Sequence, residues 1–133
     1  MKKIAIIGTR KRDGWIDFDV IERLFFDIYE PGDWIVSGGC PTGGDRFAKK
    51  LHQKHFIPYL EFPANWKKYG KGAGFIRNSD IAKNADILIS CLTRQSEGGA
   101  DDTVKKFKVF NMKPKLILNY EDETVWLNLE KNQ

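Results

Sequence analysis

Short, continuously apolar runs alternate with longer amphipathic stretches along this chain of 133 residues. A run that is apolar at consecutive positions is typical of a strand covered on both faces, as in a parallel sheet. The strand candidates are Ile4–Ile7, Trp34–Ser37, Ile57–Glu61, Asp86–Leu92 and Lys115–Asn119. The alternation therefore restricts the fold to the α/β class, with helices on both sides of a mainly parallel five-stranded sheet.

The amphipathic stretches are the helix candidates. They cover Asp17–Tyr29, Asp45–His55, Gly74–Asn84 and Ala100–Asn111, and a short terminal helix is expected over Glu123–Leu129. The order βαβαβαβαβ predicts right-handed crossovers and a Rossmann-like three-layer architecture. Because 133 residues are too few for two domains of ordinary size, we expect a single domain over residues 1–133.

Charge and cysteine content narrow the possible partners and the compartment. The net charge is +4, with Lys and Arg scattered among acidic residues, which favours an anionic small molecule as readily as a nucleic acid. Cys40 and Cys91 have neither metal-ligand spacing nor the density of a disulfide framework, so we expect reduced thiols in a cytoplasmic protein. No apolar run has the length of a membrane span or a secretory signal, and no membrane association is expected. His52 and His55 suggest no further metal ligands, so neither a metal nor a cofactor is predicted.

A glycine-dense segment follows the second expected strand. From Ser37 to Ala48 it reads Ser-Gly-Gly-Cys-Pro-Thr-Gly-Gly-Asp-Arg-Phe-Ala. Glycines allow several backbone N–H groups to point inward together, and a helix that begins behind them adds the positive end of its dipole, so the loop is suited to phosphate. It matches neither the Walker pattern nor GxGxxG. The alternative is an ordinary strand-to-helix connection in which Asp45 caps the helix.

The other polar loops also follow expected strands. Ligands of open α/β sheets bind beyond the carboxyl ends of the strands, so we expect these loops to meet at one rim. Gly8-Thr9-Arg10 follows the first strand, where the guanidinium can make a bidentate contact with phosphate. A surface loop with a solvated Arg10 is the alternative. Thr93–Gly99 follows the fourth strand, and its Gly98-Gly99 pair is a second possible phosphate cradle.

The segment after the third strand, Phe62–Asn78, is long for a connection in so small a domain. Trp66 and Tyr69 offer a flat apolar wall for a base or sugar, and Arg77 can point toward a phosphate. The alternatives are a hydrophobic lid for Trp66 and a surface ion pair for Arg77. In the last long helix, Asp101 and Asp102 serve either as helix caps or as catalytic acids.

Motifs that belong together lie in order along nearly the whole chain, at Gly8-Thr9-Arg10, Ser37-Gly38-Gly39, Gly43–Ala48, Phe62–Trp66, Tyr69-Gly70, Ala73-Gly74 and Arg77-Asn78. The set resembles the YspA-like branch of the SLOG superfamily. That superfamily includes the Lonely Guy nucleotide phosphoribohydrolases and the DNA-processing Smf proteins, and its members are Rossmann-like domains that bind nucleotides or their derivatives. The resemblance implies ligand roles for Gly8, Thr9, Arg10, Gly38, Gly39, Gly43, Asp45, Trp66, Arg77 and Asn78. The predicted ligand site also takes in Ser37, Arg46, Gly98 and Gly99.

The resemblance covers the ligand-binding motifs more fully than the catalytic residues. The Lonely Guy enzymes use an Arg, which Arg77 matches, and a Glu, where this chain has Lys105. A lysine opposes the positive charge that develops when an N-glycosidic bond breaks, so Asp101, Asp102 or Glu97 would have to supply the carboxylate. Arg77 and Asp101 are therefore the candidate catalytic residues. Asn65 also stands where this branch is expected to have an Asp.

The leading hypothesis is a protein that binds a nucleotide or a nucleotide-derived phosphate as a sensor, carrier or sequestering protein. The alternatives are a nucleoside-monophosphate N-glycosidase and a single-stranded nucleic-acid-binding module. A homo-oligomer is also expected, because related proteins commonly assemble. Phe107 and Phe110 can bury in a dimer face, and the alternative for both is the core.

Overall fold

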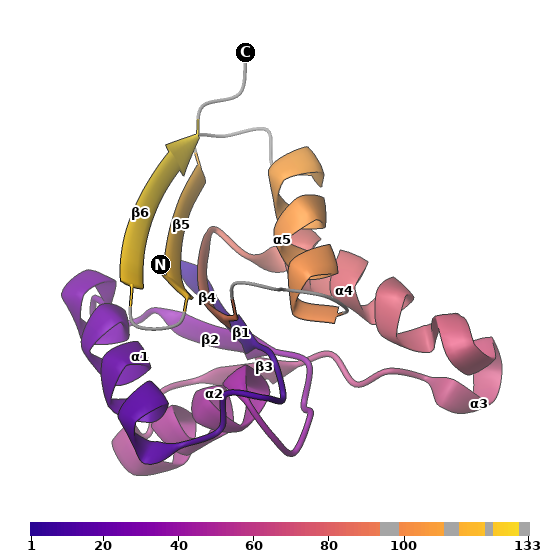
Figure 1. Ribbon diagram of the computed structural model, residues 1–133, viewed down its shortest axis with the longest axis horizontal. Helices are drawn as coiled ribbons and strands as arrows, with labels where there is room; N and C mark the ends of the chain where they lie inside the picture. Colours follow the sequence, from indigo (N-terminus) through magenta and orange to yellow (C-terminus); the bar gives the residue numbers. More distant parts are fainter. Residues whose placement is uncertain (94–98, 111–114, 122–123, 131–133) are drawn as a thin grey trace.

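The computed structural model describes residues 1–93, 99–110, 115–121 and 124–130 (Figure 1). Its strands are β1 (Lys3–Gly8), β2 (Trp34–Ser37), β3 (Tyr59–Glu61), β4 (Ile87–Leu92), β5 (Lys115–Glu121) and β6 (Thr124–Glu130). Its helices are α1 (Trp15–Ile28), α2 (Gly44–His55), α3 (Trp66–Tyr69), α4 (Ala73–Asn84) and α5 (Gly99–Phe110), with a 3₁₀ turn, η1 (Gly70–Gly72), before α4. Within the described residues no helix has the length and apolar character that crossing a bilayer requires.

One sheet runs through the molecule in the strand order β3-β2-β1-β4-β5-β6. The first five strands in chain order are parallel, and β6 pairs antiparallel with β5. The order of the strands reverses between β1 and β4, which is the position where doubly wound sheets bind their ligands. The predicted α/β class and the Rossmann-like parallel arrangement are confirmed.

The sixth strand corrects one expectation from the sequence. A short helix was expected over Glu123–Leu129, whereas Thr124–Glu130 is a strand. Val125, Leu127 and Leu129 alternate with other residues, which is the period of a strand rather than of a helix. Only two positions separate β5 from β6, so the chain has no room for a crossover and the two strands pair antiparallel.

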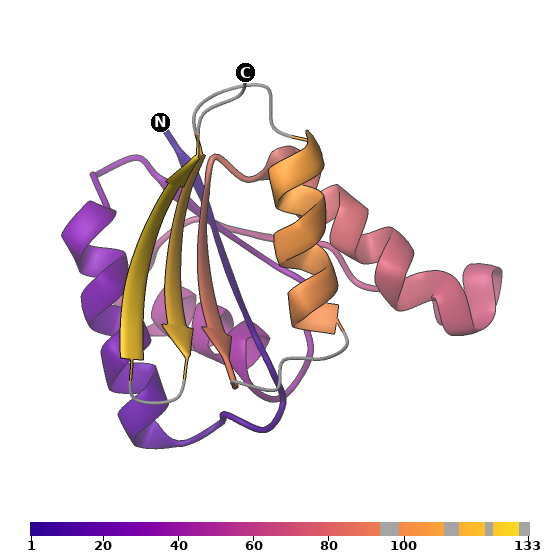
Figure 2. The same cartoon turned by 45° about the horizontal axis from the view of Figure 1, so that its top comes forward.

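The sheet has an apolar core on each face. Ile4 and Ile6 of β1 pack with the core that includes α1 and α2, whereas Ala5 and Ile7 pack with the core that includes α4 and α5. Figure 2 shows these two helix pairs on opposite sides of the strands. The consecutive apolar positions of β1 are thus explained by burial on both faces.

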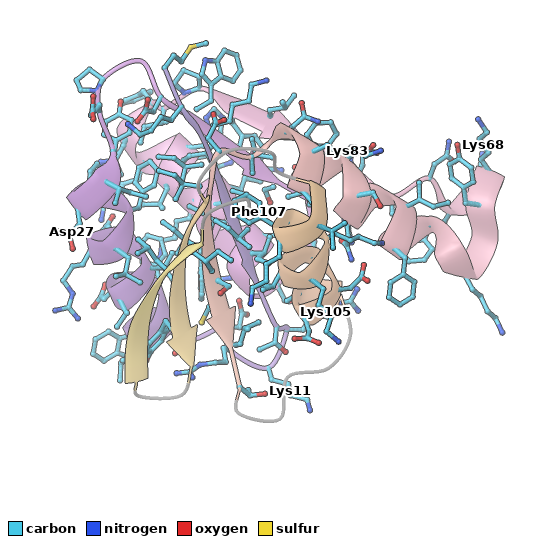
Figure 3. All side chains as sticks on the ribbon, turned by 90° about the horizontal axis from the view of Figure 1, so that it is seen from above. Lys11, Asp27, Lys68, Lys83, Lys105 and Phe107 are labelled. Carbon is cyan, nitrogen blue, oxygen red and sulfur yellow. The ribbon has the colours of Figure 1, made fainter. Side chains whose placement is uncertain are left out.

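Phe107 belongs to the core and not to an exposed dimer face. Its side chain is 0% exposed and packs with Ile81 and Ile117 in the cluster on the α4 and α5 side. Figure 3 shows it on the inner side of α5. Of the two alternatives for Phe107, a dimer face and the core, the structure thus supports the core, and the side chain of Phe110 lies outside the described residues.

The segment after β3 forms helical turns instead of the long loop expected from the sequence. Asn65 begins α3, and its Oδ1 accepts a hydrogen bond from the Lys68 N–H at 3.1 Å. No residue of α3 is buried, and Figure 1 shows α3 and η1 projecting beyond the sheet at the start of α4. We call residues 65–76 the arm.

The start of α2 lies directly against the end of β1. A Cβ placed on Gly44 would overlap the backbone of Ile7 and Gly8. Gly43, just before the helix, has φ +74°, and a Cβ there would meet the Thr9 carbonyl oxygen. These two glycines therefore bring the loop before α2 into contact with the loop after β1.

We predict that Gly44→Ala destabilises the fold by about 3 kcal/mol or more, because a methyl group at this position must push the helix off the strand backbone. The free energy of unfolding in urea measures the effect. Gly72→Ala is the control, since nothing lies within 4 Å of a Cβ there, and its expected change is below about 1 kcal/mol. Equal effects of the two substitutions would contradict the predicted contact.

Candidate functional site

A cavity of about 340 Å³ lies at the carboxyl ends of the parallel strands, where the strand order reverses. Four segments line it, and each follows a different parallel strand along the chain. They contribute Ile7, Gly8, Thr9, Arg10 and Lys11 from β1 and its loop, Cys40 and Asp45 around the start of α2, Arg77, Asn78 and Ile81 from α4, and Gly99, Ala100 and Thr103 from α5. Each of the four segments predicted to meet at one rim thus contributes at least one described residue to a single cavity.

The loop after β1 presents two cations at the cavity. The Thr9 N–H donates to the Cys91 carbonyl oxygen at 2.9 Å, which fixes this loop to β4. Arg10 and Lys11 are exposed, and within the described part of the chain no carboxylate pairs with them. Arg12 differs, because its guanidinium bonds Asp17 at 2.7 Å and the Leu92 carbonyl oxygen at 3.1 Å. Two of the three consecutive cations are therefore available for an anion.

Arg77 is held in the cavity wall by backbone and side-chain acceptors. Its Nη1 donates to the Gly38 carbonyl oxygen at 2.8 Å, and its Nε donates to Asn78 Oδ1 at 3.0 Å. A Cβ on Gly38 would lie 2.5 Å from Nη1, so a larger residue would require the guanidinium to move from this position. Gly38 thus helps to position the Arg77 guanidinium.

Asn78 connects the start of α5 to Arg77. The side chain is 3% exposed, and its Nδ2 donates to the Gly99 carbonyl oxygen at 3.0 Å and to Asp102 Oδ2 at 3.2 Å. Asp102 in turn pairs with Lys106 at 2.8 Å. With its amide hydrogens committed to these partners, Asn78 acts as a positioning residue for the two helices that border the cavity.

Asp45 is the acidic residue of the cavity wall among the described residues. Its Oδ2 accepts the Cys40 N–H at 3.0 Å and so holds the glycine loop in place. Burial raises the pKa of the Asp45 carboxyl above its ordinary value, outweighing the opposite effects of the Cys40 N–H and the Arg77 charge. The carboxylate thus fixes the loop from within, and it is not the helix cap considered from the sequence.

Arg46 is directed away from the cavity, toward Asp13. Its Nε bonds Asp13 Oδ1 at 2.6 Å, and the same oxygen accepts the Gly43 N–H at 2.8 Å. Burial favours the neutral carboxyl, but the Arg46 and Gly43 hydrogen bonds outweigh burial and lower the pKa of Asp13. Arg46 therefore anchors the glycine loop to the loop after β1 and does not line the cavity.

Several other predicted site residues also lie outside the cavity wall. Ser37 is fully buried beneath it, where its Oγ accepts the Gly39 N–H at 3.4 Å. Gly39 packs against the Glu61 side chain, and Trp66 lies 56% exposed on the arm. Asp101, the candidate catalytic acid, pairs instead with Lys105 at 3.2 Å, and Gly98 lies outside the described residues.

The structure adds cavity residues that sequence reasoning did not select. Lys11 comes directly after Arg10, which was selected because it follows the first strand, and this position in the sequence could have identified Lys11 as well. Ile7, Ile81, Ala100 and Thr103 form much of the remaining wall. Apolar residues on a strand or helix are usually core residues, so no sequence pattern distinguishes these.

Both histidines have structural roles. His52 Nδ1 lies 2.6 Å from the Ile57 carbonyl oxygen, and its ring stacks on Tyr59. His55 Nε2 contacts Glu22 at 2.9 Å. Over the ranges that the structure describes, no group of three or more His, Cys, Asp or Glu side chains is arranged to hold a metal ion.

A scan of protein-family models, a search of curated proteins and a search of solved structures found no match to this chain.

We predict that Asp45→Asn changes the pH dependence of stability. The folded-state pKa of Asp45 is raised above the unfolded value, so the folded state holds its proton more tightly. The wild type should therefore lose stability relative to Asp45→Asn as the pH rises from about 4, near the ordinary carboxyl value, through the raised folded-state pKa. Urea unfolding of both proteins across this range measures the difference. A difference that stays constant with pH would show that the Asp45 carboxyl titrates normally.

Proposed function

We propose that this protein binds a nucleotide or a nucleotide-derived phosphate ligand in the cavity between β1 and β4. The observation that carries the proposal is the grouping of Arg10, Lys11 and Arg77 around a cavity at the reversal of strand order. A volume of about 340 Å³ is in the lower range of small-molecule sites, which suits a ligand of mononucleotide size.

The phosphate is assigned to the side of the cavity that carries the exposed cations. Arg10 and Lys11 offer N–H donors without an acid among the described residues to compete for them. Gly99 and Ala100, the first residues of α5, border the same space. The leading N–H groups of a helix have no partners within it and carry the positive end of its dipole, so they favour an anion there.

The base or sugar is assigned to the apolar part of the wall. Ile7, Ile81 and Ala100 offer a surface that excludes water from a ring. Thr103 adds a hydroxyl, although its Oγ1 already donates to the Gly99 carbonyl oxygen at 2.9 Å. An apolar wall with a few polar groups is the usual composition of a small-molecule site.

Binding without turnover is favoured over N-glycosidase activity. Hydrolysis of the glycosidic bond needs a carboxylate that faces the sugar. Among the described acids, Asp101 pairs with Lys105 and Asp102 with Lys106, both outside the cavity wall. The Asp45 carboxylate holds the loop by accepting the Cys40 N–H, and Glu97 lies outside the described residues. The proposed role is therefore that of a sensor, carrier or sequestering protein.

The proposal includes a reducing, cytoplasmic location, which the free thiols of Cys40 and Cys91 support. Assembly into a homo-oligomer stays a prediction, and native mass spectrometry of the purified protein tests it. The same spectrum reveals any nucleotide that co-purifies with the protein.

Calorimetry against nucleoside monophosphates, adenosine diphosphate and triphosphate, ADP-ribose and cyclic dinucleotides tests the proposed function. We expect at least one phosphate-bearing compound to bind and its matching nucleoside to bind much more weakly. Arg10→Ala should weaken binding about tenfold or more, because a hydrogen bond to a charged group is lost. Arg23→Ala on the exposed face of α1 is the matched control. No binding by the whole panel, or equal affinities for wild type and Arg10→Ala, would refute the proposed function.

A further inference from the structure

The segment between β3 and the middle of α4 is one of the acid-free, basic segments of the chain. Between Glu61 and Asp80 the sequence has no acidic residue and has four cations, Lys67, Lys68, Lys71 and Arg77. With four positive charges and no negative charge, this segment attracts an anionic partner.

The arm within this segment exposes aromatic rings beside its lysines. Trp66 is 56% exposed, Tyr69 43% and Phe75 51%. Lys68 lies over the Tyr69 ring at 5.1 Å, and Figure 3 shows Lys68 near the far end of the arm. Large exposed aromatic side chains that gather in one place are typical of an interaction surface.

The arm adjoins the cavity through Trp66. A Cβ placed on Gly74 would lie 3.5 Å from Trp66 Cη2 and 3.9 Å from Arg77 Nη2. Trp66 and Arg77 therefore both lie beside Gly74, where the arm joins the cavity wall. A ligand that extends past Arg77 out of the cavity would meet the Trp66 ring first and the lysines of the arm beyond it.

We propose that the arm binds a single-stranded oligonucleotide whose terminal nucleotide occupies the cavity, an inference that rests on the proposed nucleotide-binding function. Aromatic rings stack on bases irrespective of sequence, and lysines beside them contact the phosphates, as in other single-strand sites. The continuity with a cavity of nucleotide size favours this partner over an acidic protein or an anionic membrane, neither of which carries a terminal nucleotide.

Fluorescence anisotropy with 12-mers of dA, dT and U, beside calorimetry with the corresponding monophosphates, tests the proposal. We expect at least one 12-mer to bind more tightly than its monophosphate. Lys67→Glu combined with Lys71→Glu should weaken 12-mer binding about tenfold or more and lower the salt slope by about 1.4, since each lysine contributes about 0.7. Monophosphate affinity should not change. Trp66→Ala should weaken 12-mer binding about tenfold, because one stacking contact is lost.

The matched control is Arg23→Glu combined with Lys49→Glu, which makes the same charge change on exposed positions of α1 and α2. It should leave 12-mer affinity within about twofold of wild type at the same salt. Since α3 has no buried residue, the arm variants should unfold at the wild-type urea concentration.

The outcomes separate this inference from the function on which it rests. Monophosphate binding with 12-mers that bind no tighter, or with arm variants that bind 12-mers like the control, would overturn the inference alone. Tighter binding to a duplex or to phosphatidylserine vesicles than to any 12-mer would also overturn it. If 12-mers bind through the arm but no monophosphate binds, both the cavity function and the shared site are refuted.

Discussion

The contact between the start of α2 and the end of β1 determines the rest of the site. Gly44 lies so close to the backbone of Ile7 and Gly8 that no side chain fits between helix and strand. Asp13 then bridges the two loops by accepting hydrogen bonds from the Gly43 N–H and from Arg46. This contact places the glycine loop beside the loop that carries Arg10, and the cavity lies between them and the helices of the opposite face.

The glycines of this loop mainly allow other groups to lie close to the backbone, and they do not form a free anion cradle. Gly38 makes room for the Arg77 guanidinium, and Gly44 makes room for the strand. The Asp45 carboxylate accepts the Cys40 N–H, so this donor of the loop is already engaged. The positive charge available to a ligand therefore comes from the other loops, above all from Arg10 and Lys11.

The sequence predicts the parallel part of the fold because burial on both faces leaves β1 and β4 apolar at consecutive positions. It predicts the rim for the same reason, since polar loops must follow such strands. The sequence does not predict the direction in which each charged side chain of these loops points. Arg46 and Asp101 are charged residues in motif positions, but each pairs with another residue of the chain. Arg46 bonds Asp13, which lies 33 positions away in the sequence, and Asp101 pairs with Lys105 one turn along the same helix. Trp66 was predicted as part of a flat wall for a base or sugar, but α3 places it on the arm outside the cavity wall.

A titration followed by ¹⁵N-resolved amide shifts tests the central claim most directly, with a nucleoside monophosphate added to the labelled protein. The account predicts saturable shifts for Thr9, Arg10, Gly99 and Ala100, which come from two distant parts of the chain and border one cavity. The amide of Asp27 on α1 should not move. Saturable shifts confined to residues away from the cavity, or no shifts with any monophosphate, would contradict the account.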